Sequence, residues 1–481
     1  MSYTDFLRQQ CFIGGEWCDA DSGKTIAVVD PGSGKELGIV PAMGEAETAR
    51  AVAAAEKALP AWRAKTAGER ARIMRKLFDL MMASQDALGE LLSREQGKPH
   101  AEAKGEIAYG ASFIEWFAEE GKRAYGEVIP AHAADRRIVT LRQPVGVVAT
   151  ITPWNFPNAM IGRKLGPALA AGCTVVIKPA SATPFSALAI AVLAERAGLP
   201  AGVLNVVTGS ARAIGGELTR NPAVRKLSFT GSTEIGRQLL RECADTVKKV
   251  SLELGGNAPF IVFDDADIDA AVDGAMISKF RNNGQTCVCA NRIYVQESVY
   301  DAFAAKLAEK VRALKVGPGT GEGVTAGPLI DGGALAKVEE HIADAVAKGG
   351  KVMVGGKKHA LGGRFFEPTV ITGVTKDMKV ATEETFGPLA PLFKFKDEAD
   401  AIAQANATEF GLASYFYARD LGRVWRVAEA LETGIVGINT GLISTEVAPF
   451  GGVKQSGLGR EGSKYGIDDF VQIKYISMGG V

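Results

Sequence analysis

The sequence is poor in the residues that build disulfide frameworks and zinc sites. It contains six cysteines and four histidines in 481 residues. The cysteines are Cys11, Cys18, Cys173, Cys243, Cys287 and Cys289. This spacing matches neither a ladder of disulfides nor the paired knuckles of a structural zinc site. We therefore expect no metal ion and a protein of a reducing compartment, the cytoplasm.

A surplus of charge is also missing, because 55 Lys and Arg residues offset 55 Asp and Glu residues. Binding to nucleic acid through bulk charge needs an excess of cations that displaces counterions, so no nucleic-acid partner is expected. Hydrophobic residues make up 47% of the chain, which is typical of a globular protein and excludes a disordered one.

Long apolar runs are absent as well. The longest clean run, residues 187–194, is far shorter than the roughly 18 residues that a membrane span requires. The first residues do not show the basic and then apolar order of a secretory signal. No membrane partner is therefore expected.

The length allows about three domains at about 150 residues each. Residues 43–60 and 68–96 are predicted amphipathic helices. From residue 136 onward, short runs rich in Val, Ile and Thr alternate with stretches rich in Ala and Leu. The predicted strands lie in 136–154, 174–179, 203–209, 226–231 and 249–256, and the helices in 160–171, 183–197, 211–220 and 233–244. This alternation predicts an α/β fold with a parallel, doubly wound sheet, and its return after residue 258 predicts a second α/β domain.

Two glycine-rich segments are candidates for phosphate binding. The G-x-G-x-x-G at 457–462 follows loop-like residues, so we interpret it as a turn. GSTEIG, at 231–236, follows a predicted strand and opens a predicted helix. Its N–H groups and the helix dipole favour a phosphate there, while an ordinary turn capped by Ser232 remains the alternative. Arg237 and Gln238 replace the Lys-Ser/Thr pair of a P-loop, so the sequence does not support the nucleotide hydrolysis that a P-loop performs.

Cys287 is the candidate nucleophile, because small polar residues precede it and structural cysteines usually lie in apolar runs. A helix start at this point would lower the pKa of its thiol. Cys289 leaves three interpretations open: a metal or redox pair, a reversible disulfide that blocks Cys287, or a packing residue.

Glu253 ends a predicted strand that runs into two glycines. A carboxylate at the carboxyl end of a strand, with a pKa raised by partial burial, can act as a general base. The alternative is a charge that faces solvent from the edge of the sheet.

Seven segments together resemble the NAD(P)-dependent aldehyde dehydrogenase superfamily. They are TPWNFP (152–157), KPAS (178–181), FTGSTEIG (229–236), LELGGNAP (252–259), NNGQTCVCANR (282–292), EETFGP (383–388) and PFGGVKQSGLGREG (449–462). The segments run in the family's order, and the likeness extends over nearly the whole chain. The residues between them most resemble the succinate-semialdehyde dehydrogenase branch, with the glutarate-semialdehyde dehydrogenases as near relatives.

The resemblance implies a catalytic set. Cys287 would attack the aldehyde carbon, Asn155 and the Cys287 N–H would hold the oxyanion, and Glu253 would activate the water that releases the acid. The cofactor-binding residues would be Trp154, Lys178, Ser181, Gly231, Ser232, Leu254, Glu384 and Phe386. Core packing is the alternative for Trp154 and Phe386.

The substrate of the resembled branch carries its own carboxylate, which requires fixed cations. The resemblance implies Arg163, Arg281 and Ser444 as its ligands, and an ordinary salt bridge is the alternative for each arginine.

Ser181 decides the expected cofactor. Members that prefer NAD often carry Glu at this position, where it repels a 2′-phosphate. Ser181 removes that charge, and Lys178 can act as a phosphate counterion. We therefore expect NADP as the preferred cofactor, with NAD as the alternative.

The resemblance also implies an aldehyde dehydrogenase-like architecture of three parts. A Rossmann-type cofactor domain would take residues 1–124 and 145–253, and an α/β catalytic domain would take residues 254–450. Residues 125–144 and 451–481 would form a small β oligomerisation flap of a homotetramer or a dimer.

Two other functions compete with a dehydrogenase that uses water. A binding protein that kept the fold but lost catalysis would lack the nucleophile or the base, and both Cys287 and Glu253 are present. A CoA-acylating dehydrogenase would pass the acyl group to CoA, whereas Glu253 favours hydrolysis. We expect succinate semialdehyde as substrate, with glutarate semialdehyde or a broader range of aldehydes as alternatives.

Overall fold

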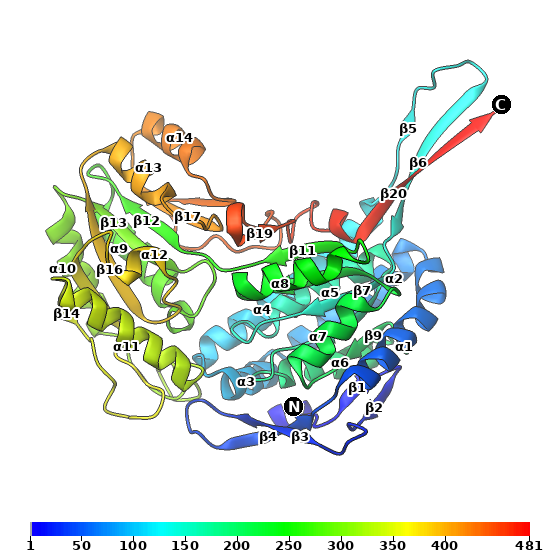
Figure 1. Ribbon diagram of the computed structural model, residues 1–481, viewed down its shortest axis with the longest axis horizontal. Coiled ribbons are helices and arrows are strands. Elements are labelled where there is room, and N and C mark those ends of the chain that lie inside the picture. Colours follow the sequence, from blue (N-terminus) through cyan, green and yellow to red (C-terminus); the bar gives the residue numbers. More distant parts are fainter. Residues whose placement is uncertain (1) are drawn as a thin grey trace.

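The computed structural model describes residues 2–481 and contains two large sheets that lie side by side, with a narrow β arm projecting from one of them (Figure 1). The strand order of the eight-stranded sheet is β19-β11-β10-β7-β8-β9-β1-β2. Its strands are β1 (Cys11–Ile13), β2 (Glu16–Cys18), β7 (Val147–Ile151), β8 (Thr174–Lys178), β9 (Leu204–Val206), β10 (Val224–Thr230), β11 (Lys249–Glu253) and β19 (Gly457–Leu458).

The central strands of this sheet are buried on both faces, as β-branched runs between helices predict. Val175 and Ile177 of β8 belong to one apolar core, whereas Val176 between them belongs to a second core. The helices of this part are α1 (Glu45–Ala64), α2 (Ala67–Ala83), α3 (Gln85–Gln96), α4 (His100–Glu120), α5 (Ala159–Ala171), α6 (Phe185–Ala197), α7 (Ala211–Arg220) and α8 (Thr233–Ala244). The predicted parallel, doubly wound sheet is therefore confirmed.

One predicted helix is divided in two. The stretch 68–96 forms α2 and α3, because Ser84 takes φ −107° and ψ 10° and thereby ends α2. Ahead of α1, the chain forms a separate two-stranded sheet of β3 (Thr25–Val29) and β4 (Glu36–Pro41).

The seven-stranded sheet has the order β14-β15-β16-β13-β12-β17-β18. Its strands are β12 (Ala258–Val262), β13 (Ala290–Gln296), β14 (Lys351–Val354), β15 (Thr369–Val374), β16 (Leu389–Phe395), β17 (Ala413–Tyr417) and β18 (Ile435–Ile438). Its helices are α9 (Ile268–Phe280), α10 (Tyr300–Arg312), α11 (Gly332–Ala347), α12 (Lys379–Thr382), α13 (Glu398–Asn406) and α14 (Leu421–Ala430). The second α/β unit predicted after residue 258 is confirmed.

The projecting arm is a three-stranded sheet, in which β6 (Arg136–Pro144) lies between β5 (Val128–Ile129) and β20 (Val471–Gly479) (Figure 1). Its last strand begins twenty residues after the expected flap boundary at 451. The intervening segment instead returns to the eight-stranded sheet, where Gly457 pairs with Glu253 and Leu458 pairs with Leu252. Within residues 2–481, the helices are all too short or too polar to cross a membrane.

The parallel strands β7, β8, β10 and β11 end at the same edge of their sheet, which faces the seven-stranded sheet. Ligands of such sheets bind beyond the carboxyl ends of the strands. The segments that follow these strands contain most of the predicted site residues.

Candidate active site

A cavity of about 210 Å³ lies at the carboxyl edge of the eight-stranded sheet. Its lining comes from both halves of the molecule and contains Pro153, Trp154, Asn155, Met160, Thr230, Gly231, Ser232, Leu254, Gly255, Cys287, Glu384 and Phe386. Most of the residues predicted for the nucleophile and the cofactor are therefore brought together in one place.

Cys287 lies in a loop between a short 3-10 turn, Arg281–Gly284, and β13. Asn282 and Asn283 adopt positive φ angles of 50° and 55°, a conformation that asparagine tolerates better than most residues. The Asn283 Nδ2 donates to the Gly327 carbonyl at 2.8 Å, and the Gln285 Oε1 accepts from the Ile330 N–H at 3.0 Å. The small polar residues that mark this loop in the sequence therefore hold it in place.

The expectation of a lowered pKa for Cys287 is wrong. Cys287 does not stand at the start of an α-helix, so no helix dipole favours its thiolate. Burial raises the pKa of the thiol to about 12, and the guanidinium groups of Arg163 and Arg281 only oppose this rise. The thiol is therefore protonated at neutral pH and must lose its proton before it can act as a nucleophile.

Asn155 is fixed in position through hydrogen bonds to its main-chain carbonyl. Its carbonyl accepts from the Lys98 ammonium at 2.7 Å and from the Asn282 Nδ2 at 3.0 Å. Lys98 is buried and forms an ion pair with Glu106 at 2.5 Å. The side-chain Nδ2 of Asn155 donates to the Gln285 carbonyl at 3.2 Å, so it points at the nucleophile loop.

The contacts of Lys98 and Asn282 with the Asn155 carbonyl, here called the clamp, could not be predicted from sequence patterns. Glu102 also belongs to this clamp. The Glu102 carboxylate accepts from the Asn282 N–H at 2.7 Å and so joins α4 to the nucleophile loop. Glu106 accepts from the Asn158 N–H at 2.9 Å, just ahead of α5. The only signal in the sequence was a lysine between Gly97 and Pro99, which is too weak to identify a partner.

Glu253 is buried, with 5% of its surface exposed, so the alternative of a solvent-facing edge charge is wrong. Neither of its carboxylate oxygens has a hydrogen-bond partner among the described residues. Burial raises the pKa of Glu253 well above its usual value and Glu461 adds to the rise, while Arg163 and Lys164 oppose it. A buried carboxyl of this kind is suited to general acid–base work near neutral pH.

Two glycines follow Glu253 because two groups approach the backbone there. A Cβ at Gly256 would lie 2.6 Å from the Cys287 carbonyl oxygen, closer than atoms can pack. A Cβ at Gly255 would lie 3.2 Å from a carboxylate oxygen of Glu384. Because Gly255 and Gly256 have no side chains, the backbone after β11 can lie close to both Cys287 and Glu384.

Lys178, the last residue of β8, is a buried cation that pairs with no carboxylate among the described residues. Its ammonium donates to the Pro179 carbonyl at 3.0 Å, and burial lowers the pKa of Lys178 to about 8. Ser181 is exposed three residues further on. An unpaired buried cation beside an exposed serine is the arrangement that an anionic or hydroxylated ligand would satisfy.

In the lining of the cavity, burial raises the pKa of Glu384 to about 7, and the Glu384 Oε1 accepts from the Gly256 N–H at 3.4 Å. Phe386 has a positive φ of 55°, and its ring meets that of Trp154 edge to face at 5.5 Å. Trp154 and Phe386 therefore both face the cavity as well as each other, rather than a closed core.

Of the two glycine-rich segments, only GSTEIG, at 231–236, lies at the cavity. Gly231 and Ser232 form the turn from β10 into α8, and the Ser232 hydroxyl caps the helix by accepting from the Ile235 N–H at 3.5 Å. The segment 457–462 forms β19 and a turn, with no α-helix after it among residues 463–481. Its interpretation as a turn is confirmed.

The three predicted carboxylate ligands do not line one pocket. Arg281 and Ser444 line a small pocket with Tyr415, behind the nucleophile loop. Arg163 instead lies against Glu461, with 2.7 Å between its Nε and a carboxylate oxygen, and its guanidinium stacks 3.8 Å from the Phe450 ring centre.

Cys289 and Cys287 both have free thiols. The Cys289 sulfur accepts from the Lys279 ammonium at 3.3 Å and donates to the Lys279 carbonyl at 3.4 Å. Cys289 thus makes buried polar contacts with Lys279, and a disulfide between Cys289 and Cys287 stays a prediction. The described residues contain no cluster of three metal-ligating side chains.

A model of the aldehyde dehydrogenase family matches residues 17–476. This chain belongs to the aldehyde dehydrogenase family. It is 69% identical to a glutarate-semialdehyde dehydrogenase of Pseudomonas aeruginosa, over 99% of this chain and 98% of the relative. It is also 69% identical to an NADP-dependent succinate-semialdehyde dehydrogenase of Escherichia coli, over 99% of each chain. Among solved structures, a succinate-semialdehyde dehydrogenase of Burkholderia pseudomallei is 67% identical with a TM-score of 0.98, and the match covers 99% of this chain and 98% of that one.

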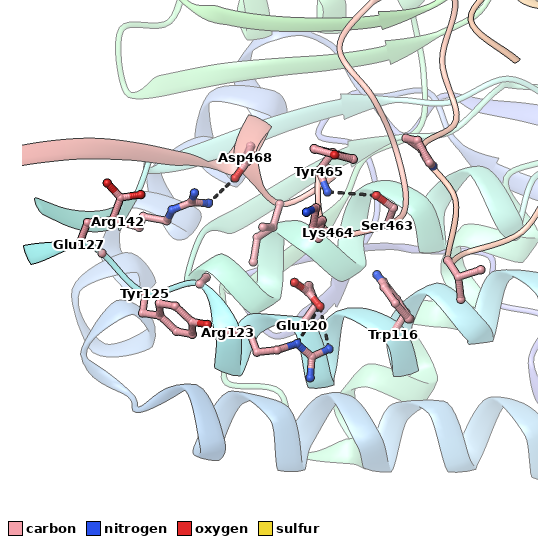
Figure 2. Close-up of a pocket in the computed structure, with 15 residues that line it drawn as sticks. Trp116, Glu120, Arg123, Tyr125, Glu127, Arg142, Ser463, Lys464, Tyr465 and Asp468 are labelled. Carbon is pink, nitrogen blue, oxygen red and sulfur yellow. Dashed lines mark hydrogen bonds and ion pairs between the residues drawn. The ribbon is translucent and has the colours of Figure 1, made fainter.

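A larger cavity of this aldehyde dehydrogenase, about 800 Å³, lies elsewhere, at the base of the β arm. Figure 2 shows that its charged groups are largely paired with one another. Arg123 binds Glu120 at 2.7 Å, and Arg142 binds Asp468. Its lining contains no cysteine, so this cavity offers no thiol nucleophile for an aldehyde.

Proposed function

We propose that this aldehyde dehydrogenase oxidises semialdehyde acids with NADP in preference to NAD. Succinate semialdehyde is the first substrate, and glutarate semialdehyde is the alternative. The observation that carries the proposal is the pocket in which Arg281 and Ser444 lie together beside the loop of Cys287. Relatives that are 69% identical are named for these two substrates, which supports it.

The residues at the carboxyl edge fit the dinucleotide. Lys178 is an unpaired buried cation suited to the adenosine ribose and its 2′-phosphate, and Ser181 adds no negative charge there. Gly231 and Ser232, at the start of α8, suit the pyrophosphate, and Glu384 suits the nicotinamide ribose, with Leu254, Trp154 and Phe386 as packing contacts. When bound, the cofactor supplies the oxidant, which accepts a hydride from the substrate carbon.

In the first step, the Cys287 thiol gives its proton to solvent water, and its sulfur forms a bond to the aldehyde carbon. The carbonyl oxygen becomes an oxyanion, which the Asn155 Nδ2 and the Cys287 N–H stabilise. The clamp of Lys98 and Asn282 on the Asn155 carbonyl fixes the direction of this amide. Loss of hydride then leaves the acyl group on Cys287 as a thioester.

In the second step, Glu253 removes a proton from water, and the resulting oxygen nucleophile attacks the thioester carbon. The carbon–sulfur bond breaks, the acid leaves, and Cys287 departs as a thiolate. The unpaired carboxylate oxygens of Glu253 are free to accept that proton. Retention of this base favours hydrolysis over transfer to CoA.

Recognition of the substrate's carboxylate falls to Arg281 and Ser444, with Arg163 as a third ligand. Arg163 has an unpaired Nη2 in addition to its contact with Glu461, so it retains a donor for the substrate. A paired guanidinium and carboxylate form a strong, directional contact, which an uncharged aldehyde cannot make.

The test is steady-state kinetics on semialdehyde acids of three to six carbons, each beside the uncharged aldehyde of equal length, with NADP and with NAD. We expect kcat/KM to peak at the four-carbon acid and to exceed that of butanal by about 100-fold or more, because the arginines bind only the acid. Equal values for acid and aldehyde would contradict the proposal. A rate that depends on added CoA would contradict the hydrolytic step.

We also propose that the β arm, strands β5, β6 and β20, joins copies of this chain into a homotetramer or a dimer in the cytoplasm. Its strands expose large apolar side chains, including Val128 at 82%, Ile473 at 70% and Tyr475 at 59%. Exposed apolar patches of this kind mark interfaces. Light scattering coupled to gel filtration should give a multiple of the 50.6 kDa chain mass, and a monomer would contradict the proposal.

A further inference from the structure

Tyr109 of α4 has a buried hydroxyl group that makes no well-formed hydrogen bond to the described residues, although the Ser444 side chain lies close to it. Buried tyrosine hydroxyls usually find a partner, because an unpaired polar group is costly away from water. A buried donor that lacks a well-formed hydrogen bond therefore indicates a group that a ligand can complete.

The position of Tyr109 relates it to both predicted arginines. Its ring meets the Phe113 ring at 5.1 Å in an edge contact, and the Arg163 guanidinium lies 5.7 Å from the centre of that same ring. Tyr109 also packs against the small apolar cluster that contains Phe156. The Arg281 guanidinium carbon lies 4.9 Å from the centre of the Phe156 ring. Tyr109 thus lies against the two aromatic residues, Phe113 and Phe156, over which the two arginine guanidinium groups lie.

The third predicted ligand, Ser444, also lies close to the Tyr109 hydroxyl. The Ser112 hydroxyl, one turn further along α4, donates to the Glu446 carboxylate at 3.2 Å, which holds the 444–446 segment against this face of the helix. Burial raises the pKa of Tyr109, while Arg163, Arg281 and the Ser444 hydroxyl all oppose the rise. The phenol therefore stays protonated and remains a hydrogen-bond donor at neutral pH.

We infer that Tyr109 is a substrate-binding residue whose hydroxyl donates a hydrogen bond to the anionic end of the substrate. The inference rests on the proposed function and extends it, since Tyr109 lies close to Arg163, Arg281 and Ser444. A neutral donor adds no charge but selects against aldehydes that end in a methyl group, because such a substrate leaves the buried hydroxyl unpaired.

The test compares Tyr109→Phe with the wild type on succinate semialdehyde and on butanal, which has the same length and no carboxylate. The variant keeps the ring and its contact with Phe113. We expect kcat/KM for succinate semialdehyde to fall about tenfold, mainly through a higher KM, as for the loss of one hydrogen bond to a charged group. The value for butanal should stay within about twofold of the wild type.

The matched control is Tyr300→Phe, which removes another buried hydroxyl, one that donates to the Leu392 carbonyl at 2.9 Å far from the site. It should leave the ratio of the two substrates unchanged. An unchanged kcat/KM for succinate semialdehyde in Tyr109→Phe, or an equal loss on both substrates, would overturn the inference. Failure of the proposed function has a different signature, namely a wild type without preference for the acid.

Inhibition by succinate gives a measure that does not depend on turnover of the aldehyde. Tyr109→Phe should raise the inhibition constant of succinate about tenfold and leave that of uncharged butanamide unchanged. An unchanged constant for succinate would also overturn the inference. Thermal unfolding of both variants checks that they fold.

Discussion

Arg163 and Glu461 form a buried ion pair beside the base, with 2.7 Å between the guanidinium Nε and the carboxylate. Lys164 binds the same carboxylate, and Glu461 raises the pKa of Glu253 while both cations oppose the rise. The base is therefore tuned by a balance between one carboxylate and two cations that the chain places around it.

Glu461→Gln should change the pH dependence of hydrolysis. The variant removes the negative charge that raises the pKa of Glu253 and leaves Arg163 and Lys164 without a partner, and both changes lower that pKa. Glu253 acts as a base only when deprotonated, so activity is lost as pH falls through its pKa. We expect the acidic limb of the kcat profile to move to lower pH in the variant. A profile that does not move, or that moves to higher pH, would contradict this coupling.

Lys98→Met should weaken both catalysis and stability. The variant leaves the buried Glu106 without its cation, which typically costs about 3–5 kcal/mol of unfolding free energy. It also removes a donor from the Asn155 carbonyl, so kcat should fall more than KM changes. Urea unfolding and steady-state kinetics measure the two effects.

The matched control for this clamp is the double variant Lys98→Met with Glu106→Gln. It removes both charges, so it should recover part of the lost stability while kcat stays low. Recovery of kcat together with stability would show that the clamp acts on folding alone.

Ser181→Glu should reverse the cofactor preference. A carboxylate at this exposed position repels a 2′-phosphate and accepts from ribose hydroxyls, so kcat/KM for NADP should fall about tenfold or more while that for NAD is retained. Ser181→Gln, of similar shape and no charge, is the control and should have a smaller effect. A strong preference of the wild type for NAD would remove the basis of this prediction.

Sequence patterns predicted the fold well because the central strands are buried on both faces, which leaves β-branched runs between helices. They also singled out Cys287, because it follows small polar residues instead of lying in an apolar run, and Glu253, because it is an acidic residue at the end of a strand that runs into two glycines. The roles of Asn155, Lys178 and Glu384 came from the family resemblance and not from local chemistry.

Contacts between distant segments were beyond sequence patterns. The binding of Lys98 to the Asn155 carbonyl and of Arg163 to Glu461 joins residues 57 and 298 positions apart. The direction of the Cys287 pKa was also mispredicted, because burial depends on packing from both halves of the molecule. The arm boundary differed for a similar reason: β19 finds its partner in β11, far back along the chain.

The most direct measurement of the central claim uses Glu253→Gln, which keeps the nucleophile and removes the base. Mixed with NADP and succinate semialdehyde, this variant should produce a burst of NADPH of about one per subunit and then almost no turnover. Intact-mass and peptide analysis should then find a succinyl group on Cys287. Full steady-state turnover, or a variant that forms no acyl group on Cys287 during the burst, would contradict the account.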